Sequence, residues 1–190
     1  MRLTIPLLLA AVISTQLTAC IPIIAGGAAA TGVMVADRRT SGTYIEDESI
    51  ELKARQAINE QIGDAIHASV TSFNRNVLLT GEAFSAADKA KAEALVKNID
   101  NVRNVVNEIM VGPKSSLVNR SKDSYITSKV KARIVSDHSF PANYVKVVTE
   151  RSVVYLMGLV TKQEADKAVE IASSTDGVDK VVKVFEYIEE

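Results

Sequence analysis

Val-Tyr-Leu-Met-Gly at residues 154–158 and Asp-Gly-Val-Asp-Lys-Val-Val at 176–182 decide the fold, because both patterns also occur earlier in the chain. The earlier copies are Val-Leu-Leu-Thr-Gly at 77–81 and Asp-Asn-Val-Arg-Asn-Val-Val at 100–106. Two different motifs that share a spacing of about 76 residues indicate two copies of one small domain. Each copy spans about 65 residues, near the lower limit for a domain that buries its own core.

The first copy is predicted to begin with a helix over about 47–62, with Asp47 as its N-cap. Apolar residues at every fourth position from Ile50 to Ile62 give this helix a buried face. Two alternating runs predict a hairpin, and a second helix and a last strand follow; these elements are expected at about 66–73, 77–83, 85–98 and 102–111.

The second copy repeats this order. Ile126, Val130 and Ile134 lie on one face of its first helix, and a capping box from Thr161 to Glu164 opens its second helix. The predicted fold is therefore α+β: two tandem units, each α-β-β-α-β, with a three-stranded mixed sheet packed against two helices. The expected domains are 46–112 and 123–190, joined by a polar linker at 113–122.

Residues 1–19 are typical of a secretory signal peptide. Arg2 is the only charge in the first 36 residues and precedes an apolar run that is too short for a comfortable membrane span. The run ends in Leu-Thr-Ala-Cys at 17–20, which resembles a lipobox with Cys20 as the acylated residue. An ordinary signal peptide with a chance cysteine is the alternative. Residues 20–45 are interpreted as a flexible tether.

The composition argues against several classes of function. From Cys20 onward the chain holds 21 Lys and Arg against 23 Asp and Glu, so nothing favours nucleic acid as a partner. Cys20 is the only cysteine, which leaves no disulfide to form. His67 and His138 occupy unmatched positions in the two copies and lack partners at metal-ligand spacing. We therefore expect no catalytic residues, no metal and no small-molecule substrate.

The repeated V-x-L-x-G and D-x-V-x-x-V-V motifs resemble those of BON domains. With a lipobox ahead of two copies, essentially the whole mature chain is similar to the dual-BON outer-membrane lipoproteins. The resemblance implies a protein anchored in the outer membrane by acyl chains on Cys20, facing the periplasm, with no other cofactor. Ile21 after Cys20 is similar to lipoproteins exported to that membrane. The resemblance to the dual-BON lipoproteins also implies a role in envelope integrity, association with division sites, and binding of anionic phospholipid through the second domain.

The first helices of the two copies differ in charge. Residues 46–62 hold five acidic and two basic side chains, whereas residues 120–134 hold five basic and one acidic. The apolar core does not require either sign of charge on these helices. The difference in charge therefore suggests that they contact other molecules. The predicted phospholipid-binding residues lie on and near the basic helix: Tyr125, Ser128, Lys129, Ala132, Arg133, Leu159 and Val160.

At 100° per residue, Tyr125, Lys129 and Arg133 form a stripe beside the buried face. A tyrosine can lie at a headgroup layer while long basic side chains reach phosphates. A solvated basic face is the alternative for this stripe, and for Val160 the alternative is a hydrophobic staple ahead of Thr161. The competing functions are a protein adaptor or chaperone-like module for envelope assembly, and a passive spacer.

Overall fold

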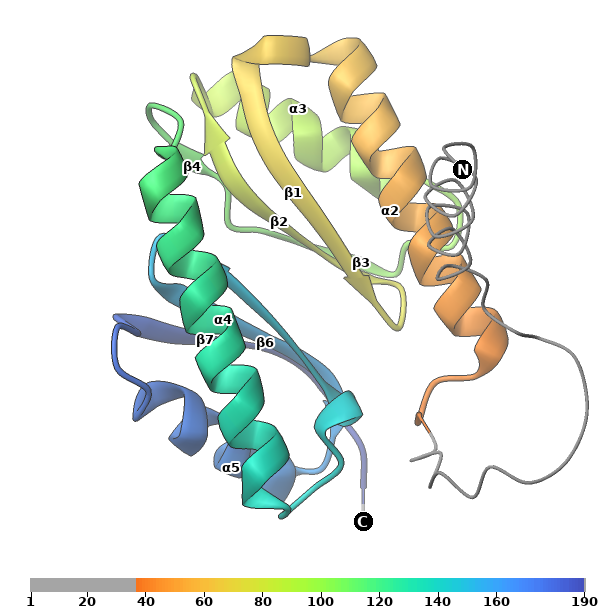
Figure 1. Ribbon diagram of the computed structural model, residues 1–190. Coiled ribbons are helices and arrows are strands. Elements are labelled where there is room, and N and C mark those ends of the chain that lie inside the picture. Colours follow the sequence, from red (N-terminus) through yellow and green to blue (C-terminus); the bar gives the residue numbers. More distant parts are fainter. Residues whose placement is uncertain (1–36, 190) are drawn as a thin grey trace, which may run out of the picture. The chain divides into compact units, whose positions relative to one another are not determined.

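The computed structural model of the 190-residue chain describes residues 37–189 (Figure 1). The predicted signal peptide, lipobox and Cys20 lie outside these residues. The described residues belong to one compact unit. In the described part of the chain, no helix is both long and apolar enough to cross a membrane.

The first repeat contains one mixed sheet whose central strand is β2. This strand pairs antiparallel with β1 and parallel with β3 and β4. The predicted last strand is thus split in two, because the chain leaves the ladder briefly between β3 and β4. The elements are α2 (Ser41–Gln61), β1 (Ile66–Phe73), β2 (Asn76–Ala83), α3 (Ala86–Lys97), β3 (Asn104–Asn107) and β4 (Met110–Val111).

The second repeat has the same order, with β6 between β5 and β7. The strand β6 pairs antiparallel with β5 and parallel with β7. The predicted α+β fold of tandem α-β-β-α-β units is therefore confirmed. The elements are α4 (Leu117–Asp137), β5 (Val145–Glu150), β6 (Val153–Val160), α5 (Lys162–Ser173) and β7 (Lys180–Tyr187).

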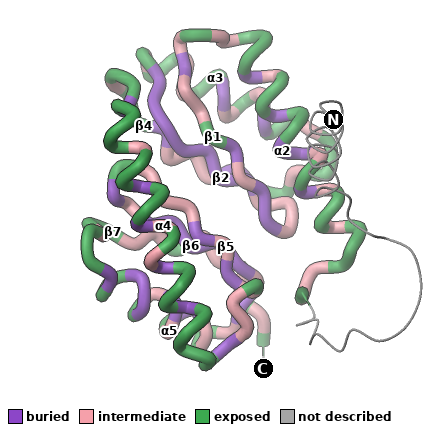
Figure 2. Tube along the Cα trace, in the orientation of Figure 1, coloured by how far each residue is buried: buried purple, intermediate pink, exposed green. Residues whose placement is uncertain are grey.

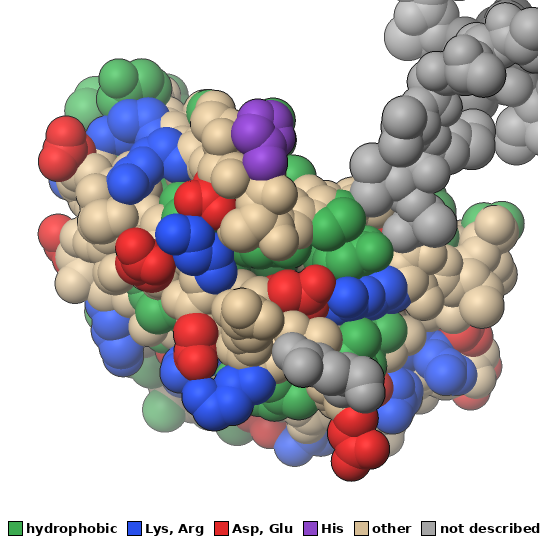
Figure 3. Space-filling model, turned by 90° about the horizontal axis from the view of Figure 1, so that it is seen from below, with side chains coloured by type: hydrophobic (Ala, Val, Ile, Leu, Met, Phe, Trp, Pro, Cys, Tyr) green, Lys and Arg blue, Asp and Glu red, His purple; other side chains and the backbone are tan. Residues whose placement is uncertain are grey.

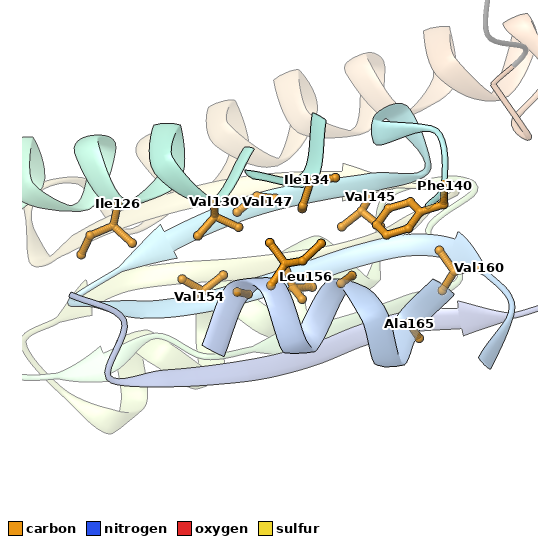
Figure 4. Close-up of a cluster of buried hydrophobic side chains, with 13 residues drawn as sticks. Ile126, Val130, Ile134, Phe140, Val145, Val147, Val154, Leu156, Val160 and Ala165 are labelled. Carbon is orange, nitrogen blue, oxygen red and sulfur yellow. The ribbon is translucent and has the colours of Figure 1, made fainter. Parts of the chain in front are cut away.

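Each sheet is covered on one face by the two helices of its own repeat. In the second repeat, Ile126, Val130 and Ile134 of α4 pack against β5, β6 and α5 (Figure 4). In the first repeat, Ile50 and Ala54 of α2 belong to the corresponding cluster. The predicted buried faces of both first helices are thus correct.

The opposite faces of the two sheets pack against each other. Phe73 and Leu78 of the first repeat form one buried cluster with Tyr155 and Met157 of the second. Successive residues of β2 and β6 therefore belong to different cores, and both strands are buried along nearly their whole length (Figure 2). Strands buried on both faces have continuous apolar runs, as β6 does from 153 to 160.

The repeated D-x-V motif forms the same structure in both repeats. Its second residue has a positive φ, 69° at Asn101 and 91° at Gly177. Only glycine and a few polar residues adopt this conformation readily. Two residues later, the backbone N–H groups of Arg103 and Asp179 donate to the hairpin turns that precede them in their repeats. The motif thus turns the chain into the third strand.

Two boundaries differ from the sequence prediction. Helix α2 begins at Ser41 with Thr40 as its N-cap, so Asp47 lies inside the helix and is buried. Helix α4 begins at Leu117 with Ser116 as its N-cap, within the predicted linker. Both corrections have one cause. Polar residues that a helix turns outward, or buries with partners, resemble loop residues in sequence.

The predicted tether to residue 45 is also too long at its C-terminal end. Arg38 donates to both carboxylate oxygens of Glu164, at 2.6 and 2.9 Å, and to the backbone carbonyl of Leu159. Its guanidinium lies 3.8 Å from the ring centre of Tyr144. A bidentate pair with an aromatic contact holds Arg38 on the second repeat, so residues from 38 onward do not act as a free linker.

A buried acidic cluster lies where the repeats meet. Glu82 of β2 is 1% exposed, and Ser115 donates a hydrogen bond to its carboxylate. Arg151, in the β5–β6 turn, and His67 of β1 each lie 3.6 Å from this carboxylate. Burial raises the pKa of nearby Glu150 to about 7, and the charges of Glu82 and Asp123 act in the same direction, against Arg151 and Arg120.

Replacing Glu150 with glutamine is expected to raise the free energy of unfolding at pH 8 and to leave it unchanged at pH 4. The folded state binds the Glu150 proton more tightly than the unfolded chain does. The free energy of unfolding therefore falls as pH rises from the ordinary value, 4.5, to about 7. The gain at pH 8 should be about 1 kcal/mol, because Glu150 is only half-buried and solvent screens its charge.

Urea denaturation of the Glu150→Gln variant at the two pH values measures this difference. Glu48, an exposed residue of α2, provides the control. An equal gain from Glu48→Gln would contradict the assignment to Glu150.

Candidate functional site

The outward face of α4 is the surface that the sequence identified. Because Ile126, Val130 and Ile134 point into the core, the opposite side of the helix faces solvent. Tyr125, Ser128 and Ala132 are exposed on it, as a surface site requires. The Nζ atom of Lys129 lies 4.9 Å from the ring centre of Tyr125, so the structure brings these two predicted residues together.

Lys129 and Arg133 also bind the C-terminal end of α5. Arg133 Nη1 donates to the carbonyl of Ile171 at 3.1 Å and to the hydroxyl of Thr175 at 2.7 Å. The Nζ atom of Lys129 donates to the carbonyl of Asp176. Cations at this position satisfy carbonyl groups that the helix leaves unpaired and interact favourably with its dipole. Both side chains therefore contribute to packing within the second repeat.

Leu159 and Val160 are not part of an exposed surface, and for Val160 the prediction is wrong. Val160 is fully buried in the core of the second repeat, directly ahead of the N-cap Thr161. Leu159 is half-buried and packs against the cluster between the two sheets. Successive residues of β6 point to opposite faces of the sheet, so Val160 faces the helices of the second repeat and Leu159 faces the other sheet. The staple alternative fits the burial of Val160 better.

Sequence reasoning missed two cations that are more available than the predicted ones. Lys122 and Lys131 are exposed on α4, and neither has a hydrogen-bond or ion-pair partner among residues 37–189. Both were counted in the charge of the helix but not assigned to the site. Their angular positions flank the outward face on its two sides, a pattern that a helical projection of the sequence could have revealed.

Large apolar side chains were missed as well. Leu117, Val118 and Val135 are all more than half exposed at the two ends of α4. The outward face is therefore uncharged along its centre, with apolar ends and basic flanks. The acidic residues of α4 do not oppose this: Asp123 is buried, and Asp137 pairs with Lys167 at 3.3 Å.

The face shown in Figure 3 interleaves basic and acidic side chains. Within residues 37–189, no group of three or more His, Cys, Asp or Glu side chains is placed to hold a metal ion. His138 ends α4 with a φ of 59°, and His67 lies beside Glu82 in the first repeat. The two histidines belong to different environments.

Comparison with known proteins identifies the class of the fold. The family model described as "BON domain" matches residues 46–113 and 122–189. The chain belongs to the BON family, with two such domains in tandem.

Three curated relatives extend this result. The chain is 39% identical to "Outer membrane lipoprotein DolP" of Haemophilus influenzae over 175 residues, 91% of each chain. It is 32% identical to "21 kDa hemolysin" of Actinobacillus pleuropneumoniae over 155 residues, 80% of each. It is 30% identical to "Osmotically-inducible protein Y" of Escherichia coli K12, covering 74% of this chain and 72% of the relative. The protein is an outer-membrane lipoprotein with two BON domains, lipid-anchored and facing the periplasm.

Proposed function

We propose that this lipoprotein binds anionic phospholipid through the outward face of α4 and thereby helps to maintain the outer membrane, including at division sites. Acyl chains on Cys20 would hold the chain at the membrane, and α4 would set the orientation of the two domains. A binding role of this kind needs no catalytic residue.

The observation that carries the proposal is the pattern of side chains on α4. An uncharged outward face with Tyr125 at its centre is flanked by Lys122 and Lys131, which have no partner among the described residues. Amphipathic helices that lie on membranes combine an apolar outer face with basic flanks. Lys129 and Arg133 retain N–H groups beyond those that bind α5, so they can also reach lipid phosphates.

Charge reversal at the two free lysines is expected to weaken binding to anionic vesicles. Each basic residue near such a surface contributes about 1 kcal/mol, so Lys122→Glu with Lys131→Glu should lower affinity by about 30-fold or more. The effect should shrink in high salt, because screening weakens the contribution of both lysines. Sedimentation of the mature chain carrying Cys20→Ser with phosphatidylglycerol vesicles measures it.

The matched control reverses two exposed lysines of the first repeat, Lys53→Glu on α2 and Lys97→Glu on α3, with the same change in net charge. It should leave vesicle binding nearly unchanged. Equal losses in both variants would show that only net charge matters. If neither variant binds less, α4 is not the lipid surface, and an acidic protein surface becomes the better candidate partner.

A further inference from the structure

An exposed apolar surface lies where the end of the first repeat meets the start of α4. Its four side chains are between 48% and 77% exposed, although each is large and apolar. Contiguous apolar patches on soluble domains commonly mark contact sites. We call this surface the junction patch, and it consists of Phe84, Met110, Leu117 and Val118.

Contacts of the linker bring the segments that carry these side chains close together. Met110 pairs with Glu82 in the sheet, so the side chains of these two residues lie on the same face of the sheet. Ser115 of the linker donates to Glu82, and the Nζ atom of Lys114 lies 5.9 Å from the ring centre of Phe84. The chain then enters α4 directly, with Leu117 and Val118 in its first turn. In Figure 1 this link runs beside the end of β2.

The rim of the junction patch is basic. Lys114 lies over Phe84, and the exposed Lys122 follows in the second turn of α4. Asp64 also lies at this rim, because the adjoining Ala65 carbonyl accepts from the N–H of Phe84. Two exposed cations against one exposed carboxylate complement an anionic surface. They oppose a second copy of the chain, which would bring like charges together across the contact.

The junction patch is continuous with the outward face of α4. Leu117 and Val135 are separated by five helical turns, so they point the same way at opposite ends of the helix. A surface on which α4 lies flat would therefore meet Leu117 and Val118 at the same time. Phe84 and Met110 extend this contact beyond α4 into the first repeat.

We infer that the junction patch inserts into the bilayer to which the lipoprotein is anchored. Its apolar side chains enter the boundary between headgroups and acyl chains, while Lys114 and Lys122 contact phosphate groups. The first repeat thus contributes directly to membrane contact, although its first helix is acidic. This inference deepens the proposed function and rests on it, because the outward face of α4 sets the orientation.

Tryptophan fluorescence can locate the junction patch, because the chain contains no tryptophan. The acylated mature protein carrying Phe84→Trp is reconstituted into phosphatidylethanolamine–phosphatidylglycerol vesicles with brominated acyl chains. We expect a blue-shifted emission and quenching, strongest for bromines at shallow positions, because interfacial segments reach only about 5–10 Å into this boundary. Leu52→Trp on α2 is the matched control, since Leu52 and Phe84 are 63% and 60% exposed.

A second variant tests the contribution of α4's first turn. Leu117→Ser with Val118→Ser removes two exposed apolar side chains and leaves the N-cap Ser116 in place. In the Phe84→Trp background it should reduce quenching to the level of Leu52→Trp. Urea denaturation of the same variant checks that the fold is retained.

The outcomes separate this inference from the proposed function. Quenching of Phe84→Trp no greater than that of Leu52→Trp overturns the inference, and it does so even if Lys122 and Lys131 still govern vesicle affinity. A blue shift that grows with protein concentration in the absence of vesicles also overturns it, because a second copy would then cover the patch. Strong quenching that survives charge reversal at Lys122 and Lys131 supports insertion and counts against the electrostatic proposal.

Discussion

Replacing Gly81 with alanine is expected to lower the free energy of unfolding by about 3 kcal/mol or more. Gly81 has a φ of +111°, where side chains other than hydrogen are strained. A Cβ atom built there lies 2.0 Å from the backbone carbonyl oxygen of His67, on the neighbouring strand. Backbone atoms of a paired strand cannot move aside without breaking the hydrogen bonds between the strands. The backbone strain and the steric clash therefore add.

Gly158 occupies the corresponding place in the second repeat and permits a comparison. Its Cβ would lie 2.4 Å from the carbonyl oxygen of Tyr144, but its φ is not in the strained region. We expect a smaller loss for Gly158→Ala, about 2 kcal/mol. Gly112, which has no atom within 4 Å of an added Cβ, is the control. Urea denaturation of the three variants measures the loss of unfolding free energy in each. Similar losses for Gly81→Ala and Gly112→Ala would contradict the prediction.

The repeated motifs were sufficient to predict the order of elements, because they report backbone requirements that recur in each copy. Gly81 and Gly158 mark close backbone approach, and Asn101 and Gly177 mark the turn into the last strand. The packing of the two sheets was not predicted. Its signal was present in the continuous apolar run of β6 and in the three successive apolar residues of β2 at 77–79, because a strand with one solvent face would alternate apolar and polar residues.

Buried polar residues account for most of the remaining errors. Asp47 and Glu51 contributed to the acidic charge of the first helix, yet both are buried and bind the adjoining hairpin. Hydrophobic periodicity cannot identify such residues, because their partners lie far away in sequence. Part of the charge contrast between the two first helices therefore reflects the fold of the first repeat.

The exposed face of α4 was predicted from the sequence, but the contacts of its basic side chains were not. Exposure of Tyr125 follows from helical periodicity, so the outward face could be found from sequence. The bonds from Lys129 and Arg133 to the end of α5 depend on how two helices meet, which periodicity does not give. Phe84 and Met110 reach the same surface through strand pairing and the path of the linker, and no local pattern indicates this.

A buried carboxylate supports each β-hairpin turn, and these carboxylates provide the second large effect. Asn74 and Arg75 both have positive φ, as the two central residues of a type I′ turn require, and Asp47 accepts both N–H groups at 2.9 and 2.7 Å. In the second repeat, Asp123 accepts the N–H groups of the corresponding turn at 2.9 and 2.8 Å. Non-glycine residues are strained in this conformation, and the carboxylates offset the strain.

Asp47→Ala is expected to lower the free energy of unfolding by about 3–5 kcal/mol, because it leaves both turn N–H groups and the Ser72 hydroxyl without their acceptor and removes one of the two carboxylates that pair with Arg39. Asp123→Ala should cost less, about 2–3 kcal/mol, since the two turn N–H groups are its hydrogen-bond donors among the described residues. Urea denaturation measures both, with exposed Asp64→Ala as control. In the Asp123→Ala background, Ser152→Gly should recover about 1 kcal/mol, because glycine adopts positive φ without strain. No recovery would show that the carboxylate does not stabilise the turn conformation.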